Sequence, residues 1–194
     1  MQRYVKAIKL VCLLIVSPLL FGCSSLMQPS VPTDNNNEQA AKYNTQLGLA
    51  YLKRGDVERA KLKLTKALAQ GPDLPEVYTA MAYFQTVTGN LDTAEGYYQK
   101  AVLLDPIKGE THNIYGGFLC MESRYQEAEQ EYLKAISDPD YAAIGQAYEN
   151  AGWCALAAKH QSKAVYYFDL AIKNDPKRAP LQKEIQRLRT TELL

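Results

Sequence analysis

Residues 47–72 read LGLAYLKRGDVERAKLKLTKALAQGP, and the same order of small, apolar and turn-forming residues begins again at residues 81, 115 and 151. The first three copies are 34 residues apart, whereas the fourth is offset by two more, because Gly116 and Gly152 are separated by 36 positions. A fixed period of this length is typical of a repeat solenoid. Solenoids of paired helices usually serve as binding surfaces, so the repeat argues against an enzyme.

Each copy predicts two helices joined by a tight turn. Apolar residues recur at intervals of three and four, as one face of a helix requires. In the first copy these faces are Tyr43, Leu47, Ala50 and Tyr51, then Val57, Ala60, Leu64, Ala67 and Leu68. Gly55 can adopt the positive φ that the turn between them needs. Pro72 ends the second helix, because proline cannot continue one.

Small residues at fixed places predict where the two helices of a copy approach each other. Gly48 and Ala60 have little or no side chain, so the helix axes can come close there. The equivalent pairs are Ala82 and Ala94, Gly116 and Ala128, and Gly152 and Ala164. Larger residues such as Leu64, Tyr98, Tyr132 and Phe168 would fill the space around each contact.

These residues resemble the tetratricopeptide repeat, a helix–turn–helix unit of this period. The resemblance implies an all-α superhelix of about four repeats, near residues 41–74, 75–108, 109–142 and 145–178, within a domain spanning 39–194. We expect a longer bend at the insertion in 138–143, and a polar-faced capping helix over 180–193. Two copies depart from the usual aromatic at the fourth place, where Asn44 and His112 stand.

Residues 1–22 have the layout of a secretory signal peptide, with Arg3, Lys6 and Lys9 followed by a short apolar run. The run ends in Leu20-Phe21-Gly22-Cys23, which resembles the lipobox of bacterial lipoproteins. This implies that Cys23 becomes the lipidated first residue of the mature chain. The alternative is an ordinary cleaved leader with an incidental thiol. Residues 23–38 are polar and rich in proline and asparagine, which predicts a flexible linker.

The residue after Cys23 bears on location. Aspartate there favours inner-membrane retention in lipoproteins of two-membrane bacteria, so Ser24 implies the outer membrane, with the chain lipid-anchored and facing the periplasm. Removing the leader takes three of the 22 basic residues and no acids, which leaves a net charge of about −2. Such a charge does not favour nucleic acid as a partner.

Two cysteines remain in the predicted repeat domain. Cys120 and Cys154 are 34 residues apart, on the first helices of the third and fourth copies. Those helices are neighbours in a solenoid, and an exported protein meets conditions in which disulfides persist. We predict a disulfide between them. The alternative is two buried thiols that pack as small hydrophobes.

No arrangement of residues predicts catalysis. The two histidines, His112 and His160, lack companion cysteines or acids at the spacing of a zinc site. His112 takes a place that the repeat usually gives to an aromatic, which favours a role in packing or capping. We therefore expect no metal, and no cofactor besides a covalent lipid on Cys23.

The concave face is the predicted binding site, because the first helix of each tetratricopeptide repeat lines the inner groove. The candidate partner-binding residues there are Leu49, Leu52, Tyr83, Val87, Asn113 and Trp153. This mixture of apolar and polar side chains suits an extended peptide or an amphipathic helix. Some of these residues could instead only pack against neighbouring helices.

Two cysteine-containing segments carry a more specific resemblance. Residues 112–120, HNIYGGFLC, and 150–155, NAGWCA, together with the lipobox, look like the type IV pilus biogenesis lipoproteins of the PilF/PilW pilotin family. The resemblance implies a non-enzymatic assembly factor that helps the pilus secretin reach the outer membrane and multimerise. Its partners would be the secretin subunit and other pilus machinery proteins. The alternative is a general periplasmic scaffold lipoprotein that recruits envelope enzymes or assembly machinery.

Overall fold

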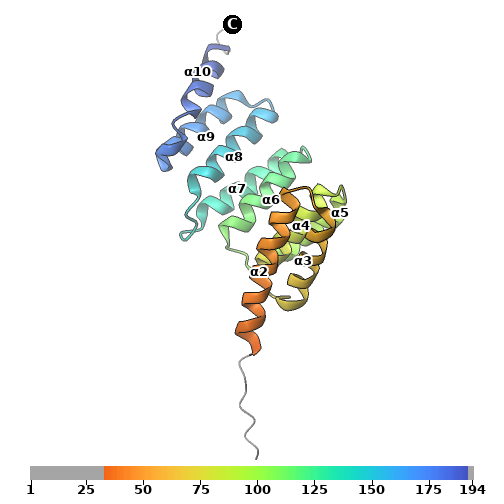
Figure 1. Cartoon of the computed structure of the whole chain (residues 1–194). Coiled ribbons are helices and arrows are strands. Elements are labelled where there is room, and N and C mark those ends of the chain that lie inside the picture. The colour runs from red at the N-terminus through yellow and green to blue at the C-terminus, as the bar shows by residue number, and fades with distance from the viewer. Residues whose placement is uncertain (1–32, 192–194) are drawn as a thin grey trace, which may run out of the picture. The chain divides into compact units, whose positions relative to one another are not determined.

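The computed structural model describes residues 33–191, and every regular element in that range is a helix. The predicted leader, Cys23 and linker residues 24–32 lie outside the described residues. The helices are α2 (Thr33–Lys53), α3 (Val57–Gln70), α4 (Pro75–Val87), α5 (Leu91–Leu104), α6 (Gly109–Met121), α7 (Tyr125–Ser137), α8 (Ile144–Ala157), α9 (Gln161–Asn174), the 3₁₀ turn η1 (Pro176–Arg178) and α10 (Leu181–Thr191). Figure 1 shows the helix pairs following one another in chain order. The predicted all-α repeat architecture is confirmed.

The turn inside each repeat has one backbone conformation whatever its residue. Gly55 and Gly89 have φ of 76° and 81°, and Ser123 and Lys159, at the same place in the third and fourth repeats, both have φ of 62°. In each case the amide donates to a carbonyl three residues earlier, as Ser123 does to Cys120 at 3.0 Å. The geometry of the helix pair therefore imposes a left-handed residue even where glycine is absent.

The predicted close approaches are present at the helix glycines. A Cβ added to Gly48 would lie 2.6 Å from the side chain of Leu64, and one added to Gly152 would lie 2.5 Å from the ring of Phe168. At Gly116 the ring of Tyr132 would be 2.9 Å away. These distances leave no room for a side chain, so in the first, third and fourth repeats the second helix packs directly on the backbone of the first.

The buried stripe of α2 differs from the predicted one. Tyr43 was expected in the core but is 63% exposed, whereas Asn44 and Thr45 are buried. Nδ2 of Asn44 donates to the side-chain oxygen of Gln70 on α3 at 2.7 Å, which satisfies it inside the repeat. Ala41, Asn44, Thr45, Gly48 and Leu52 form the stripe that faces inward. Because two residues of this stripe are polar, apolar residues at helical spacing do not identify the buried face of α2.

The boundary expected between linker and repeats is also wrong by six residues. α2 begins at Thr33, so residues 33–38 are helical rather than linker. The buried stripe from Ala41 onward stabilises the central part of α2 by packing. Adding residues to the N-terminus of a helix that is already formed does not incur the free-energy cost of nucleation. Glu38 adds an ion pair one turn later with Lys42.

The insertion in the third repeat produces the expected longer bend. The segment between α7 and α8, residues 138–143, has two residues more than the corresponding segments 71–74 and 105–108. Asp138 organises it by accepting hydrogen bonds from the amides of Gly109 at 2.7 Å and Asp140 at 2.9 Å. The bend is therefore fixed to the start of α6.

The largest core runs through the second, third and fourth repeats and includes α10. Leu181, Ile185 and Leu188 are buried there as α10 packs against α9, which confirms the predicted capping helix. Two smaller clusters lie in the first repeat and its contact with α4. Within residues 33–191, none of the helices combines the length and the apolar character that crossing a bilayer would need.

Candidate functional site

The first helices of the first three repeats enclose a hollow of about 560 Å³, which we call the inner groove. Its lining residues come from α2, α4 and α6, with one residue from the segment before α6. They are Lys42, Thr45, Gln46, Leu49, Glu76, Thr79, Ala80, Tyr83, Lys108, Glu110, Thr111 and Ile114.

Much of the groove surface is apolar. Leu49, Ala80 and Ile114 contribute aliphatic surface, and Tyr83 adds an aromatic ring that is 46% exposed. A concave surface of this kind, with a few polar groups around it, is the usual form of a binding site for another molecule.

Charged residues lie at one end of the groove. The carboxylate of Glu76 is 3.9 Å from Nζ of Lys42 and 3.6 Å from Nζ of Lys108. A hydrogen bond to Glu38 raises the pKa of Lys42 above its ordinary 10.5, so this ammonium stays charged at neutral pH. Partly exposed ion pairs contribute little to stability, so these charges are free to reorganise around a bound chain.

The residue after the groove-lining Thr111, His112, forms a buried ion pair with Glu131. Nδ1 of His112 lies 2.6 Å from Oε2 of Glu131, and Nε2 of His112 lies 2.9 Å from the carbonyl oxygen of Pro106. Burial by itself lowers the pKa of His112, but these two hydrogen bonds outweigh it, so the pKa is raised above 6.5. An imidazolium can donate to both acceptors at once, which fixes α6 to α7 and to the segment that carries Lys108.

The predicted disulfide is confirmed. Sγ of Cys120 on α6 is bonded to Sγ of Cys154 on α8, with the two Cα atoms 5.8 Å apart. The same two helices are joined by a 3.0 Å hydrogen bond from Nδ2 of Asn150 to Oδ1 of Asn113. The third and fourth repeats are therefore covalently linked on their first helices.

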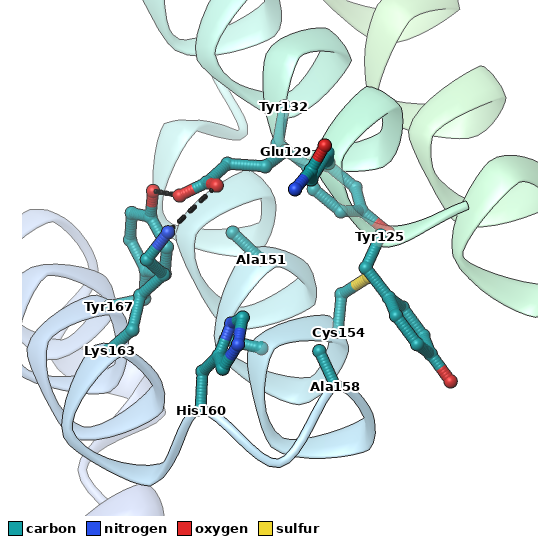
Figure 2. A pocket seen from close by; sticks show the side chains of 11 residues that line it. Tyr125, Glu129, Tyr132, Ala151, Cys154, Ala158, His160, Lys163 and Tyr167 are labelled. Carbon is teal, nitrogen blue, oxygen red and sulfur yellow. Dashed lines mark hydrogen bonds and ion pairs between the residues drawn. The ribbon is translucent and has the colours of Figure 1, made fainter. Parts of the chain in front are cut away.

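A second, smaller hollow of about 220 Å³ lies between α7, α8 and α9. Figure 2 shows Lys163 and Tyr167 converging on Glu129 there. Lys163 Nζ lies 2.9 Å from one carboxylate oxygen, and the hydroxyl of Tyr167 donates to the other. The carboxylate of Glu129 and the amine of Lys163 are thus already paired with each other across two repeats. We therefore assign this hollow to packing between repeats, and the inner groove remains the candidate site.

The structure brings no metal-binding set together. In the part of the chain that it describes, no three histidine, cysteine, aspartate or glutamate side chains are grouped so that they could hold a metal ion. His112, one of the two histidines, is bonded to Glu131 and Pro106 inside the fold. Its predicted role in packing or capping is confirmed.

Comparison with known proteins agrees with this architecture. The tetratricopeptide repeat family model matches residues 45–106 and 87–143, which together cover half of the chain. The chain belongs to the tetratricopeptide repeat family. The inner groove is therefore the concave surface that the first helices of such repeats form.

The predicted resemblance to type IV pilus proteins is also confirmed. The chain is 36% identical to the type IV pilus assembly protein PilF of Pseudomonas aeruginosa over 155 residues, 79% of this chain and 62% of that protein. It thus spans less than two thirds of the length of that relative. The solved structure of Pseudomonas aeruginosa PilF is similar with a TM-score of 0.74 and 32% identity, covering 81% of this chain and 71% of that one. The structure of PilW, a type IV pilus biogenesis factor, has a TM-score of 0.70 and 26% identity, covering 79% and 70%.

The tetratricopeptide repeats place four of the six predicted groove residues on accessible surface. Leu49 and Tyr83 line the inner groove. Val87 is half-exposed one turn after Tyr83, outside that hollow. Trp153 is 43% exposed on α8, with its ring edge-on to Phe168 and its indole N–H donating to Glu149 at 3.3 Å.

Leu52 and Asn113 were wrongly predicted to face a partner. Leu52 is only 6% exposed and packs in a core cluster with Leu64 and Phe84. It belongs to the inward stripe of α2, and burying a leucine stabilises a fold by about 1.5–3 kcal/mol, which favours the helix interface over the open groove. Asn113 is buried and bonded to Asn150.

Several groove residues were not predicted from the sequence, although its period contains a signal for them. Lys42, Glu76 and Glu110 are each 34 residues apart and stand seven positions before Leu49, Tyr83 and Gly117. Seven residues are two helical turns, so both sets lie on the same face of their helices. Lys108 precedes α6, and no periodicity within a helix could have indicated it.

Proposed function

We propose that this tetratricopeptide repeat protein is an assembly factor for type IV pili that binds the pilus secretin through the inner groove and promotes its multimerisation. The similarity to PilF, 36% identity over 79% of the chain, is the observation that carries the proposal. The similarity to the PilW structure supports the same process. The groove supplies a concave, largely apolar surface with charged residues in its lining, which suits a segment of another protein.

The proposal includes a membrane anchor at Cys23. The leader-like residues 1–22 and the lipobox-like sequence before Cys23 support lipidation, and Ser24 supports delivery to the outer membrane. One acyl chain binds a membrane only marginally, and additional chains make anchoring stable. The groove would then act on the periplasmic side, and the covalent lipid would be the chain's only non-protein group.

A deletion and a pull-down test the proposal together. Removing the gene should abolish pilus-dependent motility and reduce secretin multimers on gels of outer membranes, and the wild-type gene should restore both. A pull-down of the full chain from solubilised outer membranes should recover the secretin as a major partner. Normal multimers in the deletion strain, with envelope enzymes recovered instead, would favour the general scaffold and overturn the pilus assignment.

A further inference from the structure

A further hollow lies at the C-terminal end of the repeats, between α8, η1 and the start of α10. It measures about 500 Å³, and its lining includes Trp153 from α8, Lys177 from η1 and Lys183 from α10. We call it the C-terminal hollow. It is separate from the inner groove, with which it shares no lining residue.

Trp153 is held in place yet remains accessible in this hollow. Its indole N–H donates to Oε1 of Glu149 at 3.3 Å, and its ring lies edge-on to Phe168 with the centroids 4.8 Å apart. The other oxygen of Glu149 accepts a hydrogen bond from Arg178. Trp153 is nevertheless 43% exposed. An aromatic ring that is fixed before binding loses little conformational freedom when a partner packs on it.

The two carboxylates that line the hollow are already neutralised. Glu149 pairs with Arg178, whose Nε also lies 3.2 Å from Asp175. Glu184 pairs with Arg187 on the same helix. These acids therefore do not balance the remaining cations of the hollow.

Two lysines of the hollow have no such partner. In the part of the chain that the structure describes, Lys177 and Lys183 form no ion pair, and both are exposed. In the inner groove, by contrast, Lys42 and Lys108 lie 3.9 Å and 3.6 Å from the carboxylate of Glu76. The C-terminal hollow thus combines uncompensated positive charge with an exposed indole.

The charge of the hollow is part of a wider asymmetry along the chain. Residues 173–191 contain six basic and two acidic residues, whereas residues 33–172 contain 13 basic and 18 acidic ones. The C-terminal end is therefore basic on an otherwise acidic solenoid. Such a separation of charge attracts an acidic partner to this end and repels it from the rest of the protein.

A protein segment fits this arrangement better than an anionic membrane surface. A flat surface would attract all the exposed cations of this end, but Arg187 and Arg189 already pair with Glu184 and Asp169. Three lysines stay unpaired within residues 173–191, and two of them line the hollow beside Trp153. The free charge is therefore concentrated where a chain can enter and reach the ring.

We propose that the C-terminal hollow binds an acidic segment of the secretin, whose carboxylates pair with Lys177 and Lys183 while a neighbouring aromatic side chain packs on Trp153. Tryptophan is among the residues that most often dominate protein interfaces, and the lysines select the charge of the partner. This inference rests on the proposed function, because it takes the segment from the secretin. It adds to the largely apolar inner groove a second contact of different chemistry.

Trp153 offers a direct readout, because it is the only tryptophan in the chain. The full chain, purified in detergent, is titrated with overlapping peptides that cover the periplasmic region of the organism's own pilus secretin, with any tryptophan in them replaced by phenylalanine. An acidic peptide should shift the emission of Trp153. Its binding should weaken as sodium chloride is raised from about 0.05 to 0.5 M, because salt screens exposed charges.

Charge reversal tests the two lysines. The double variant Lys177→Glu, Lys183→Glu should weaken binding of that peptide and of intact secretin at least about tenfold, because two attractions become two repulsions. A peptide whose acids are changed to lysine should bind this variant better than it binds the wild type. The matched control is Lys61→Glu, Lys66→Glu, which makes the same change of net charge at two exposed lysines of α3. It should bind like the wild type.

The outcomes distinguish the two proposals. If the lysine variant and its control bind intact secretin equally, the assignment of the hollow is wrong while the proposed function stands. A shift of the Trp153 emission by phosphatidylglycerol in mixed micelles, with none by the peptides, would make the hollow a lipid site and would also overturn the assignment. If the wild-type chain binds neither the peptides nor intact secretin, the proposed function is overturned, and this inference with it.

Discussion

Nδ1 of His112 on α6 lies 2.6 Å from the carboxylate of Glu131 on α7, and both side chains are buried. For Glu131, burial raises the pKa, but hydrogen bonds from His112 and Lys134 outweigh it and hold the pKa below its ordinary 4.5. The pKa of His112 is raised above 6.5. Folding therefore favours the charged form of both partners.

The pair should make the stability of the protein depend on pH. The contribution of His112 is complete below about pH 6.5 and is lost as pH rises through its raised pKa. The contribution of Glu131 is present above about pH 4.5 and is lost as pH falls through its lowered pKa. Urea unfolding should thus give a larger free energy of unfolding near pH 6 than near pH 8.5.

Substitution of His112 tests this assignment. His112→Phe restores the aromatic common at this place in the repeat but removes both donors, so it should destabilise the fold by about 1–3 kcal/mol near pH 6 and flatten the decline toward alkaline pH. His160→Phe changes the chain's other histidine and should keep the decline. An unchanged decline in His112→Phe would show that another group is responsible.

Gly152→Ala should destabilise the protein by about 1–3 kcal/mol, because the new Cβ would lie 2.5 Å from the ring of Phe168 and would force the helices of the fourth repeat apart. Gly96→Ala is the control, since its Cβ meets nothing within 4 Å. That change should stabilise the protein by up to about 1 kcal/mol through helix propensity. Thermal and urea unfolding measure both, and equal effects would mean that Gly152 is not at a close contact.

Tyr83→Glu should reduce secretin multimers in outer membranes while the protein remains folded, because it places a charge on the apolar surface of the inner groove. Truncation of such an aromatic at an interface commonly costs about 2 kcal/mol or more. Leu62→Glu is matched in introducing the same charge at an apolar residue, on α3, that is 67% exposed and away from the groove. It should leave multimers unchanged, and the reverse pattern would refute the groove as the binding site.

The double variant Cys120→Ala, Cys154→Ala should lower the free energy of unfolding by about 2–4 kcal/mol while the far-ultraviolet circular dichroism stays helical. The helices persist because packing between repeats supplies most of the core. Guanidinium unfolding measures the loss. Alkylation of both cysteines in the native wild-type protein without reductant would contradict the disulfide.

The proposed lipidation of Cys23 predicts that Cys23→Ser leaves an unacylated precursor that does not fractionate with the outer membrane, because the substitution removes the proposed acceptor thiol. Mass spectrometry of the N-terminus and membrane fractionation measure this. Ser24→Asp is an informative companion, since it should keep the lipid and shift the protein to the inner membrane. Normal sorting of Cys23→Ser would refute the lipoprotein assignment.

The repeat period predicted the helix pairs, their turns, the capping helix and the disulfide. It succeeded because each of these depends on residues at fixed spacing, such as Gly48 against Leu64 or Cys120 against Cys154. The face of α2 was mispredicted because Asn44 and Thr45 are polar yet satisfied inside the fold. The burial of polar residues that have hydrogen-bond partners inside the fold cannot be predicted from the spacing of apolar residues.

The composition of the candidate site was predictable only in part. Leu49 and Tyr83 followed from the position that they share in the repeat, but Leu52 did not, because its burial depends on the rotation of α2. The bond between His112 and Glu131 joins two helices through residues 19 positions apart, a spacing that no periodic pattern specifies.

The disulfide between Cys120 and Cys154 divides the solenoid into two parts with different freedom. It ties the third repeat to the fourth, and α10 covers the fourth, whereas α2 to α5 are held by non-covalent packing alone among the described residues. In a linear array of repeats, local opening begins where the interfaces are weakest. Most of the inner groove, from α2 and α4, therefore belongs to the part of the solenoid that can open locally, while the third and fourth repeats stay tied to each other.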